Sequence, residues 1–524
     1  MRDVPITSQE WRWVAGWSLA VVLLSCLPYI IAAVTAPEGW QFAGILVNPY
    51  DGNSYLAKIQ QGMQGKWLFH LTYTPEPHEG AFIFTFYLAL GHLAALLGLP
   101  PVGVFHLARV AASLGLLLAA YRFVASVTPQ LPERRLAFGL ILSAAGLGWL
   151  GVAFGAFPID LWVPEAFVPY SLYANPHFPL AMMLMLIILQ QVIQPEPFNF
   201  YNDQFIAVSL AALALSLVLP FALLTTAAVL LVFLSWLYFS RRSLPWPQIW
   251  LTLSVGLFSA PVILYDYWVY TTNPILAGWS AQNVTAAPSP LNLLLGYGLV
   301  GLLAVGGGWW MVRRGAAAGE WLVLWWAVTG LILLYLPFDL QRRLITGLHL
   351  PLCILAALGL QRWLGQSPLK PSQRRLMTTI VVAVGALGTL FVWSLPLLAA
   401  QQSPDASETT ALLFIRPEEE TAFAWLRENA TPDDVVLASP RLGMFIPGQT
   451  GARVFYGHPF ETIAAKQKKA LVEAFYRGDI ATVSPAVDFI IYGPDERKLG
   501  QPKNLADWPV VFSADNLVIY KAPE

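Results

Sequence analysis

Twelve long apolar segments divide the chain between residues 12 and 399, and they limit its fold more than any other feature. A helix needs about 20 apolar residues to cross the roughly 30 Å of hydrocarbon in a bilayer. Hydrophobic residues fill 56% of the 524 positions and charged residues only 12%, which is not the composition of a soluble protein. The sequence therefore predicts a polytopic α-helical membrane protein with about 11–13 transmembrane helices. The segments cover residues 12–34, 81–98, 102–121, 136–156, 178–194, 205–219, 220–240, 248–265, 291–312, 321–336, 344–361 and 377–399.

Lys and Arg between the segments orient the chain, because these residues stay on the cytoplasmic side of short loops. They place the N-terminus in the cytoplasm and the tail outside. Twelve crossings do not fit this orientation, because one segment is too many between the first outer loop and the inner loop with Arg134 and Arg135. Gly98-Leu99-Pro100-Pro101 interrupts the pair 81–98 and 102–121, so we expect that one of these two segments does not fully cross. Eleven crossings then remain. The clusters are Arg2 with Arg12, Arg134 with Arg135, Arg241 with Arg242, Arg313 with Arg314, and Arg362 with Lys370, Arg374 and Arg375.

Residues 401–524 predict an extracytoplasmic soluble α/β domain that follows a multi-pass domain of residues 1–400, with QQSPDASETT (401–410) as the linker. The expected helices are 418–429 and 462–478; the expected strands are 434–439, 487–493, one after a turn within 448–458, and a closing hairpin at 508–522. Its polar residues show no catalytic pattern and are expected at the surface and in turns. These residues are Asp433, Asp434, Arg441, His458 and Glu461.

The charge balance and the cysteines exclude several kinds of function. A net charge of -1 gives no basic field for nucleic acid. Cys26 and Cys353 both lie within apolar segments, so we interpret them as small buried hydrophobes rather than a disulfide or a metal pair. The histidines and acids of the first polar loop match no compact metal-site spacing. The sequence thus indicates neither a cofactor nor a metal.

The stretch NPYDGNSYLAKIQQGMQGKW (48–67) places Asp51 just after the first apolar segment. Tyr55, Leu56 and Ile59 share one helical face and amide side chains share the other, so we expect an amphipathic helix that lies in the membrane interface. Asp51 begins this helix. It is expected either as an N-cap or as a proton acceptor for a substrate hydroxyl, and the two roles do not exclude each other.

This loop resembles the first outer loop of the GT-C superfamily of membrane glycosyltransferases, which includes protein O-mannosyltransferases and aminoarabinose transferases. The matching residues are Asp51, Tyr55, Ala57, Gly62 and Gly65-Lys66-Trp67. Those enzymes take a sugar from a polyprenyl-phosphate carrier. The resemblance implies that Asp51 is the catalytic base and that Tyr55 helps to bind substrate. Family members often carry a second acid beside the first, where this chain has Gly52.

The second outer loop, residues 157–177, carries Asp160, Glu165 and His177. The same resemblance implies a second acid here, and either Asp160 or Glu165 matches it. We favour Glu165 as the catalytic partner, because aromatic neighbours and Pro164 imply an ordered, partly buried position; Asp160 and His177 are then candidates for substrate binding. The alternatives are a solvated surface acid for Glu165 and a packing residue at a helix start for His177.

The turn PFDLQRRL places Asp339, Arg342 and Arg343 on the outer side, against the preference of cations for the inside. Guanidinium groups match phosphate oxygens, so these residues predict a site for an anionic head group at the membrane surface. The GT-C resemblance implies that the group is the carrier phosphate. The alternative is an ion pair between Asp339 and Arg343, one helical turn apart.

These features predict an inverting glycosyltransferase in the plasma (inner) membrane. It would transfer a sugar from a polyprenyl-phosphate donor to an unknown glycan, lipid or protein acceptor at the extracytoplasmic face. A flippase or transporter of lipid or sugar-lipid is the main alternative, but transport sites usually lie near mid-bilayer on broken helices, whereas here the acids gather in outer loops. A third alternative is a non-catalytic relative that keeps the fold and presents its tail as a binding module.

Overall fold

The computed structural model describes residues 5–522 except 198, 200 and 504, so Arg2, which helped to orient the chain, lies outside the described residues. The chain divides into two compact units. Unit 1 comprises Met1–Leu27, Ala108–Leu264 and Val284–Leu395. Unit 2 comprises Pro28–Leu107, Tyr265–Asn283 and Pro396–Glu524, so it joins the C-terminal segment to two earlier parts of the chain. The division into a multi-pass domain of residues 1–400 and a soluble domain of residues 401–524 stays a prediction.

Unit 1 is built of helices, and four long helices have residues in both units. The four are α1 (Ser8–Val34), α4 (Pro101–Val127), α11 (Trp246–Thr272) and α16 (Pro371–Ala400). The helices within unit 1 are α5 (Leu131–Ser143), α6 (Gly148–Gly151), α7 (Val168–Tyr173), α8 (His177–Ile193), α9 (Asp203–Val218), α10 (Pro220–Arg241), α13 (Pro290–Arg314), α14 (Ala318–Leu333) and α15 (His349–Gln366). Its short 3₁₀ helices are η1 (Val152–Phe154), η2 (Ile159–Leu161), η3 (Pro164–Ala166) and η4 (Gln341–Ile345).

All twelve apolar segments lie on helices, which confirms a polytopic helical membrane protein. Among the described residues, seven helices are long and apolar enough to span a bilayer, and α5 with α6, bent by 43°, gives an eighth candidate. Helix α3 (Thr85–Leu97) has 13 residues and a length of about 20 Å, too short to cross, whereas α4 has 27 residues. Of the two doubtful segments, α4 therefore has the length to cross. The total of eleven crossings and the orientation stay predictions.

Helices α13 and α15 pack closely because glycines face each other between them. A Cβ at Gly307 would lie 2.1 Å from the carbonyl oxygen of Leu355, and one at Gly359 would lie 2.4 Å from the Cα of Gly307. Small residues let apolar helices approach at backbone distance, where van der Waals contact replaces the hydrophobic effect. The central, almost fully buried α15 in turn fixes η4, which precedes it.

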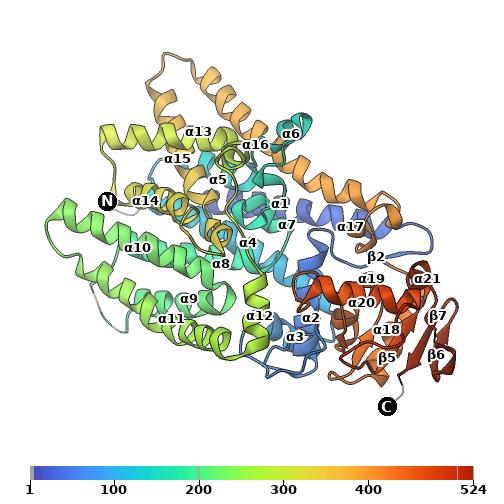
Figure 1. Ribbon diagram of the computed structural model, residues 1–524. Helices are drawn as coiled ribbons and strands as arrows, with labels where there is room; N and C mark the ends of the chain where they lie inside the picture. Colours follow the sequence, from blue (N-terminus) through green and yellow to red (C-terminus); the bar gives the residue numbers. More distant parts are fainter. Residues whose placement is uncertain (1–4, 198, 200, 504, 523–524) are drawn as a thin grey trace. The chain divides into compact units, whose positions relative to one another are not determined.

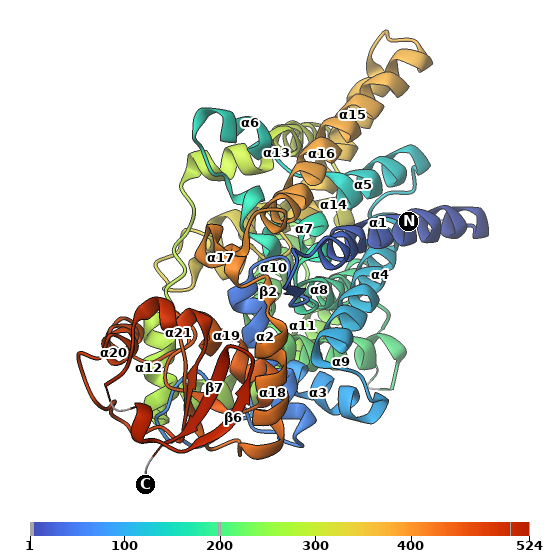
Figure 2. The same ribbon diagram turned by 90° about the vertical axis from the view of Figure 1, so that its right-hand side faces the viewer.

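Unit 2 contains a five-stranded sheet in the order β4-β3-β5-β7-β6, in which β3 runs parallel to β4 and β5 and the closing hairpin is antiparallel (Figures 1 and 2). The strands are β3 (Val435–Leu437), β4 (Arg453–Val454), β5 (Phe489–Tyr492), β6 (Val510–Ala514) and β7 (Leu517–Lys521). A separate antiparallel pair joins β1 (Gln41–Phe42) to β2 (Phe414–Ile415). The helices are α2 (Pro49–Met63), α3, α12 (Pro274–Gln282), α17 (Glu408–Ala411), α18 (Pro417–Asn429), α19 (Pro440–Thr450), α20 (Ala465–Arg477) and α21 (Pro494–Leu499), with the 3₁₀ turns η5 (Pro404–Ala406) and η6 (Leu505–Asp507).

The sheet buries both faces because its strands are apolar at successive positions. Val436 and Ile491 face a core that includes residues of α18 and α19, whereas Leu437 and Ile490 face a second core with α20. Successive side chains of a strand point to opposite faces, so a run of apolar residues supplies both layers. The expected strands and the helices α18 and α20 are confirmed. Helix α19 was not expected.

Candidate active site

In unit 1, the loop after α6 forms consecutive short turns that bury both of its acids. Prolines begin η3 and precede η2, and η3 leads directly into α7. Glu165 is 3% exposed and Asp160 is 1% exposed, so the ordered, buried position predicted for Glu165 is confirmed and a solvated surface acid is excluded.

Glu165 and Arg342, two of the predicted site residues, lie together in unit 1. The Nε atom of Arg342 is 4.0 Å from the Oε1 atom of Glu165, and its guanidinium lies 4.9 Å from the ring centroid of Trp162. The backbone of Arg342 is also fixed, because its N–H donates to the carbonyl of Thr285 at 3.1 Å. The ring of Trp162 and the carboxylate of Glu165 stabilise this guanidinium, and a quarter of the Arg342 side chain is exposed, so an anion can approach it from that side.

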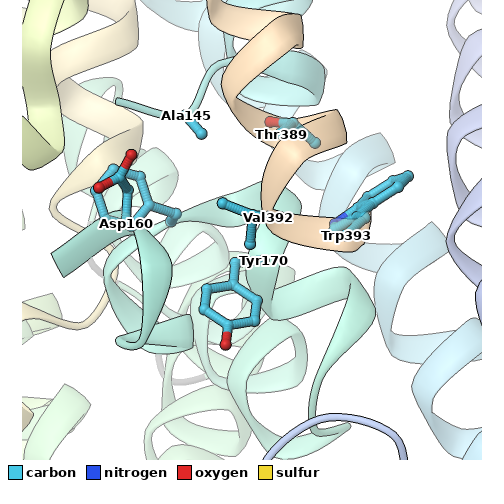
Figure 3. Close-up of a pocket in the computed structure, with 7 residues that line it drawn as sticks. Ala145, Asp160, Tyr170, Thr389, Val392 and Trp393 are labelled. Atoms are coloured by element: carbon cyan, nitrogen blue, oxygen red, sulfur yellow. The ribbon is translucent and has the colours of Figure 1, made fainter. Parts of the chain in front are cut away.

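Asp160 faces a different environment, a small hollow that it lines with Tyr170 and Trp393 among others (Figure 3). Its Oδ2 accepts from the backbone N–H of Gly148 at 2.9 Å, and Oδ1 is buried without a well-formed hydrogen bond among the described residues. Burial raises the pKa of Asp160 to about 7, although backbone hydrogen bonds act to lower it. A Cβ at Gly148 would lie 2.4 Å from Oδ1, so only glycine lets the carboxyl group approach the backbone so closely.

The other predicted site residues of unit 1 are Asp339, Arg343 and His177. Asp339 is exposed just before η4, and Arg343 is half-buried within it. Because residues 341–345 form a 3₁₀ helix, positions four apart do not share one face, and the α-helical argument for an Asp339–Arg343 pair was wrong. His177 is buried at the first residue of α8 with its ring against Phe178, as expected for a packing residue at a helix start.

In unit 2, Asp51 occupies the third position of α2 rather than the N-cap. Asn48 is the N-cap residue, in a left-handed conformation that asparagine tolerates, and Pro49 takes the first helical position. The Oδ2 atom of Asp51 accepts from the Nδ2 atom of Asn48 at 2.5 Å. A Cβ at Gly52 would lie 2.3 Å from a methyl of Ile45, so a second acid beside Asp51 does not fit this packing.

The prediction that α2 lies in the membrane interface was wrong, because unit 2 buries almost the whole helix. Gly62 and Gly91 bring α2 against α3 at backbone distance, and a Cβ on Gly62 would lie 2.1 Å from the carbonyl oxygen of Leu88. The amide side chains expected to face water are satisfied by protein groups; Gln61, for example, exchanges two hydrogen bonds with the backbone of His70. Tyr55 stacks on Tyr87 with ring centroids 4.3 Å apart.

Residues not predicted for the site lie beside Asp51 on the same helix and in the C-terminal segment. Lys58 is 1% exposed, and its Nζ lies 2.9 Å from Oε1 of Glu461; the hydroxyl of Ser54 donates to the same oxygen at 2.5 Å. The ring of His458 packs 6.0 Å from that of Tyr50. The one sequence signal for this cluster was Lys58, a single cation in an otherwise uncharged helix after Asp51.

The expectation that the polar residues of the tail lie at the surface is wrong for three of them. His458 and Glu461 are buried. Arg441 pairs with Glu419 and with Asp495 and lies over the ring of Trp40. Asp433 is exposed as expected, and Asp434 is half-buried just before β3.

Comparison with known proteins rests on structure, since no family model matches the sequence and no curated protein matches it significantly. The oligosaccharyltransferase from Archaeoglobus fulgidus, in a complex with Zn and sulfate, is similar with a TM-score of 0.53 and 12% identity, over 91% of this chain and 67% of that one. ArnT from Cupriavidus metallidurans, bound to undecaprenyl phosphate, is similar with a TM-score of 0.50 and 15% identity, over 97% and 98% of the two chains. The chain has the GT-C fold.

The arabinofuranosyltransferase AftD from Mycobacteria extends the comparison, with a TM-score of 0.50 and 15% identity, over 99% of this chain but only 40% of that one. This chain therefore spans less than half of AftD and nearly the whole of ArnT. At such low identity the similarity establishes the GT-C fold and assigns no residue a role.

Proposed function

We propose that this protein is a glycosyltransferase that moves a sugar from a polyprenyl-phosphate donor to an acceptor hydroxyl at the extracytoplasmic face of the plasma (inner) membrane. The observation that carries the proposal is the Arg342 guanidinium, which Glu165 and Trp162 hold in a defined position in η4, the 3₁₀ helix before α15. A fixed guanidinium matches a phosphate group, and desolvated neighbours strengthen that interaction. The nearly complete overlap with ArnT, whose structure contains undecaprenyl phosphate, supports the same ligand class.

The proposed reaction gives a role to each of the predicted site residues. Asp51 in unit 2 accepts the proton of the acceptor hydroxyl while its oxygen attacks the anomeric carbon. The bond between that carbon and the phosphate oxygen breaks with inversion, and the electron pair leaves with the phosphate. Arg342, with Arg343 beside it in sequence, stabilises the charge that develops on the leaving phosphate. Glu165 fixes the guanidinium of Arg342, and Asp160, Tyr55, His177 and Asp339 are candidates for contacts with the substrate.

The assay presents purified protein in detergent or vesicles with radiolabelled polyprenyl-phosphate sugars and a membrane extract as the acceptor source. We expect Asp51→Asn to lower kcat by about 10²-fold or more, because a general base contributes about 10²–10⁴-fold. Arg342→Ala should lower kcat and raise the KM for the donor, because it removes a charge-assisted contact to the phosphate. Asp479→Asn and Arg375→Ala, at exposed positions, are the matched controls and should change neither constant.

Full turnover by Asp51→Asn would remove the base assignment. Movement of the labelled lipid across vesicles without cleavage of its sugar–phosphate bond would identify a flippase. If folded protein neither transfers the sugar nor moves the labelled lipid for any donor tested, the result would favour the non-catalytic alternative.

A further inference from the structure

His458 is a buried histidine whose protonation state is fixed by its neighbours in unit 2. It lies in the loop between β4 and α20 and is 1% exposed. Its Nδ1 atom accepts hydrogen bonds from the backbone N–H groups of Phe460 at 3.0 Å and Glu461 at 3.1 Å. Two donors at Nδ1 require the neutral ring with its proton on Nε2.

The Nε2–H group faces the backbone of Tyr50 at the start of α2, the residue before Asp51, although it makes no well-formed hydrogen bond among the described residues. The ring lies 6.0 Å from that of Tyr50. Burial lowers the pKa of His458, although the carboxylates of Glu461 and Asp51 act to raise it. The carboxylate of Asp51 is therefore close enough to interact electrostatically with this ring.

Asp51 shares one face of α2 with two residues that the C-terminal segment holds. Positions 51, 54 and 58 are three and four residues apart, which places their side chains along one stripe of the helix. Ser54 and Lys58 both bind Oε1 of Glu461. The loop that carries His458 and Glu461 thus contacts Tyr50, beside the start of the stripe, and Ser54 and Lys58 on the stripe itself.

We propose that His458 is a positioning residue for Asp51: its Nε2–H is the donor that holds the first turn of α2 and thereby orients the Asp51 carboxylate. The inference rests on the proposed function, because it assigns a partner to the base of that same reaction. Besides Tyr50 and Asp51, the charged and titratable groups around this turn are Tyr55 and Lys58 on α2, Tyr87 on α3, and Glu408, Tyr456, His458 and Glu461 in the C-terminal segment. Lys58 pairs with Glu461, whereas the Nε2–H of His458 faces the backbone of Tyr50.

Three substitutions of His458 distinguish the effect of the Nε2–H donor from that of the rest of the ring. His458→Asn keeps an acceptor near the position of Nδ1 for the amides of Phe460 and Glu461 and removes the distal donor. His458→Gln reaches the position of Nε2 with an N–H group. His458→Phe keeps the ring volume without either nitrogen and serves as a second donor-free variant if His458→Asn does not fold. His70→Asn, a partly exposed histidine of the same unit, is the matched control.

The experiment measures kcat, the donor KM and the pH profile of kcat for full-length protein, at temperatures where each variant's thermal unfolding curve is still flat. For His458→Asn we expect kcat to fall about tenfold and the acid limb of the profile to shift, because Asp51 loses the neighbour that positions it. The donor KM should not change, since Arg342 is left intact. His458→Gln and His70→Asn should stay close to wild type.

Wild-type kcat and an unmoved acid limb in the donor-free variants would overturn the inference. Equal loss of kcat in the Asn and Gln variants, with the acid limb unmoved, would also overturn it and assign His458 a packing role only. Asp51→Asn separates this failure from that of the proposed function: if Asp51→Asn is inactive and His458→Asn is normal, only the inference fails. If Asp51→Asn is fully active, both fail.

Discussion

The buried ion pair between Lys58 and Glu461 is the interaction in unit 2 whose disruption we expect to cost most. The two side chains are 1% and 11% exposed, and their charged atoms lie 2.9 Å apart. Glu461→Gln keeps the size of the side chain and removes the charge, which leaves the ammonium of Lys58 buried. Removal of one partner from a buried pair costs about 3–5 kcal/mol.

Two further contacts of Lys58 place the expected loss at the lower end of that range. Its ammonium also donates to the hydroxyl of Ser54 at 2.5 Å and lies 4.5 Å from the ring centroid of Phe84. We therefore expect about 3 kcal/mol for Glu461→Gln, which corresponds to a fall in Tm of about 6–12 °C. Lys58→Met with Glu461→Leu removes both charges and should cost much less than either single change, because a buried pair and its apolar replacement are often nearly equal in stability.

The assay follows thermal unfolding of the purified protein in one detergent at one scan rate, since large membrane proteins unfold irreversibly and their Tm depends on the rate. Glu473→Gln is the matched control, because its pairing with Arg477 is partly exposed and should change Tm by less than about 2 °C. If Glu461→Gln melts like wild type, or if the double variant loses as much as the sum of the two single variants, the ion pair does not hold α2 as described.

The pH dependence gives an independent check on the same pair. Burial acts to raise the pKa of Glu461, but the charge of Lys58 and the hydrogen bonds from Ser54 and Lys58 outweigh it, so the pKa is lowered. A carboxylate with a lowered pKa stabilises the fold above its ordinary value of about 4.3, and that stability is lost as the pH falls through the lower folded value. The Tm difference between wild type and Glu461→Gln should therefore shrink as the pH falls below about 4.

Two other substitutions test the packing of each unit. Gly62→Ala should cost about 3 kcal/mol of stability, because its Cβ would lie 2.1 Å from a backbone oxygen of α3. Gly16→Ala is the control, because a Cβ there meets nothing within 4 Å. The monodisperse fraction on size-exclusion chromatography is measured for both variants. Asp160→Asn should raise Tm more at pH 8 than at pH 5. Burial raises the pKa of Asp160 to about 7, so wild type loses stability as the pH rises from the ordinary pKa towards 7 and the buried group becomes charged. Asn stays neutral and does not lose this stability. A gain in Tm that is larger at pH 5 would contradict this account of Asp160.

The sequence predicted the features of the fold that depend on local composition. Apolar segments of about 20 residues identify spans without knowledge of their neighbours. The strands of the C-terminal sheet followed from short apolar runs between turns. Helix α19 was missed because PRLGMFIPGQT contains Pro447 and two glycines and looks like a loop; the signal that was available was Ser439 followed by Pro440, an N-cap and a first-turn proline.

The candidate site was predicted less well because its decisive contacts join distant parts of the chain. Gln61 looks like part of a solvent face when α2 is considered alone, but it is buried and binds the backbone of His70, whereas Gln64 at the end of the helix is exposed as the pattern predicts. The partner of Lys58 lies 403 residues away. A helical pattern shows which side chains share a face, and it does not show whether that face meets water, lipid or protein.

The packing of α2 changes what can be expected of the C-terminal segment. The set of residues that surrounds Asp51 in unit 2 is not confined to the first loop: Ser54 and Lys58 bind Glu461, and Tyr73 donates to the carbonyl of Met444 in α19 at 2.9 Å. Removal of residues 396–524 would leave Lys58 without its carboxylate and one face of α2 without its core. A tail that only selected the acceptor could be deleted with α2 intact, whereas this segment completes the hydrophobic core and the ion pair that hold the helix carrying Asp51.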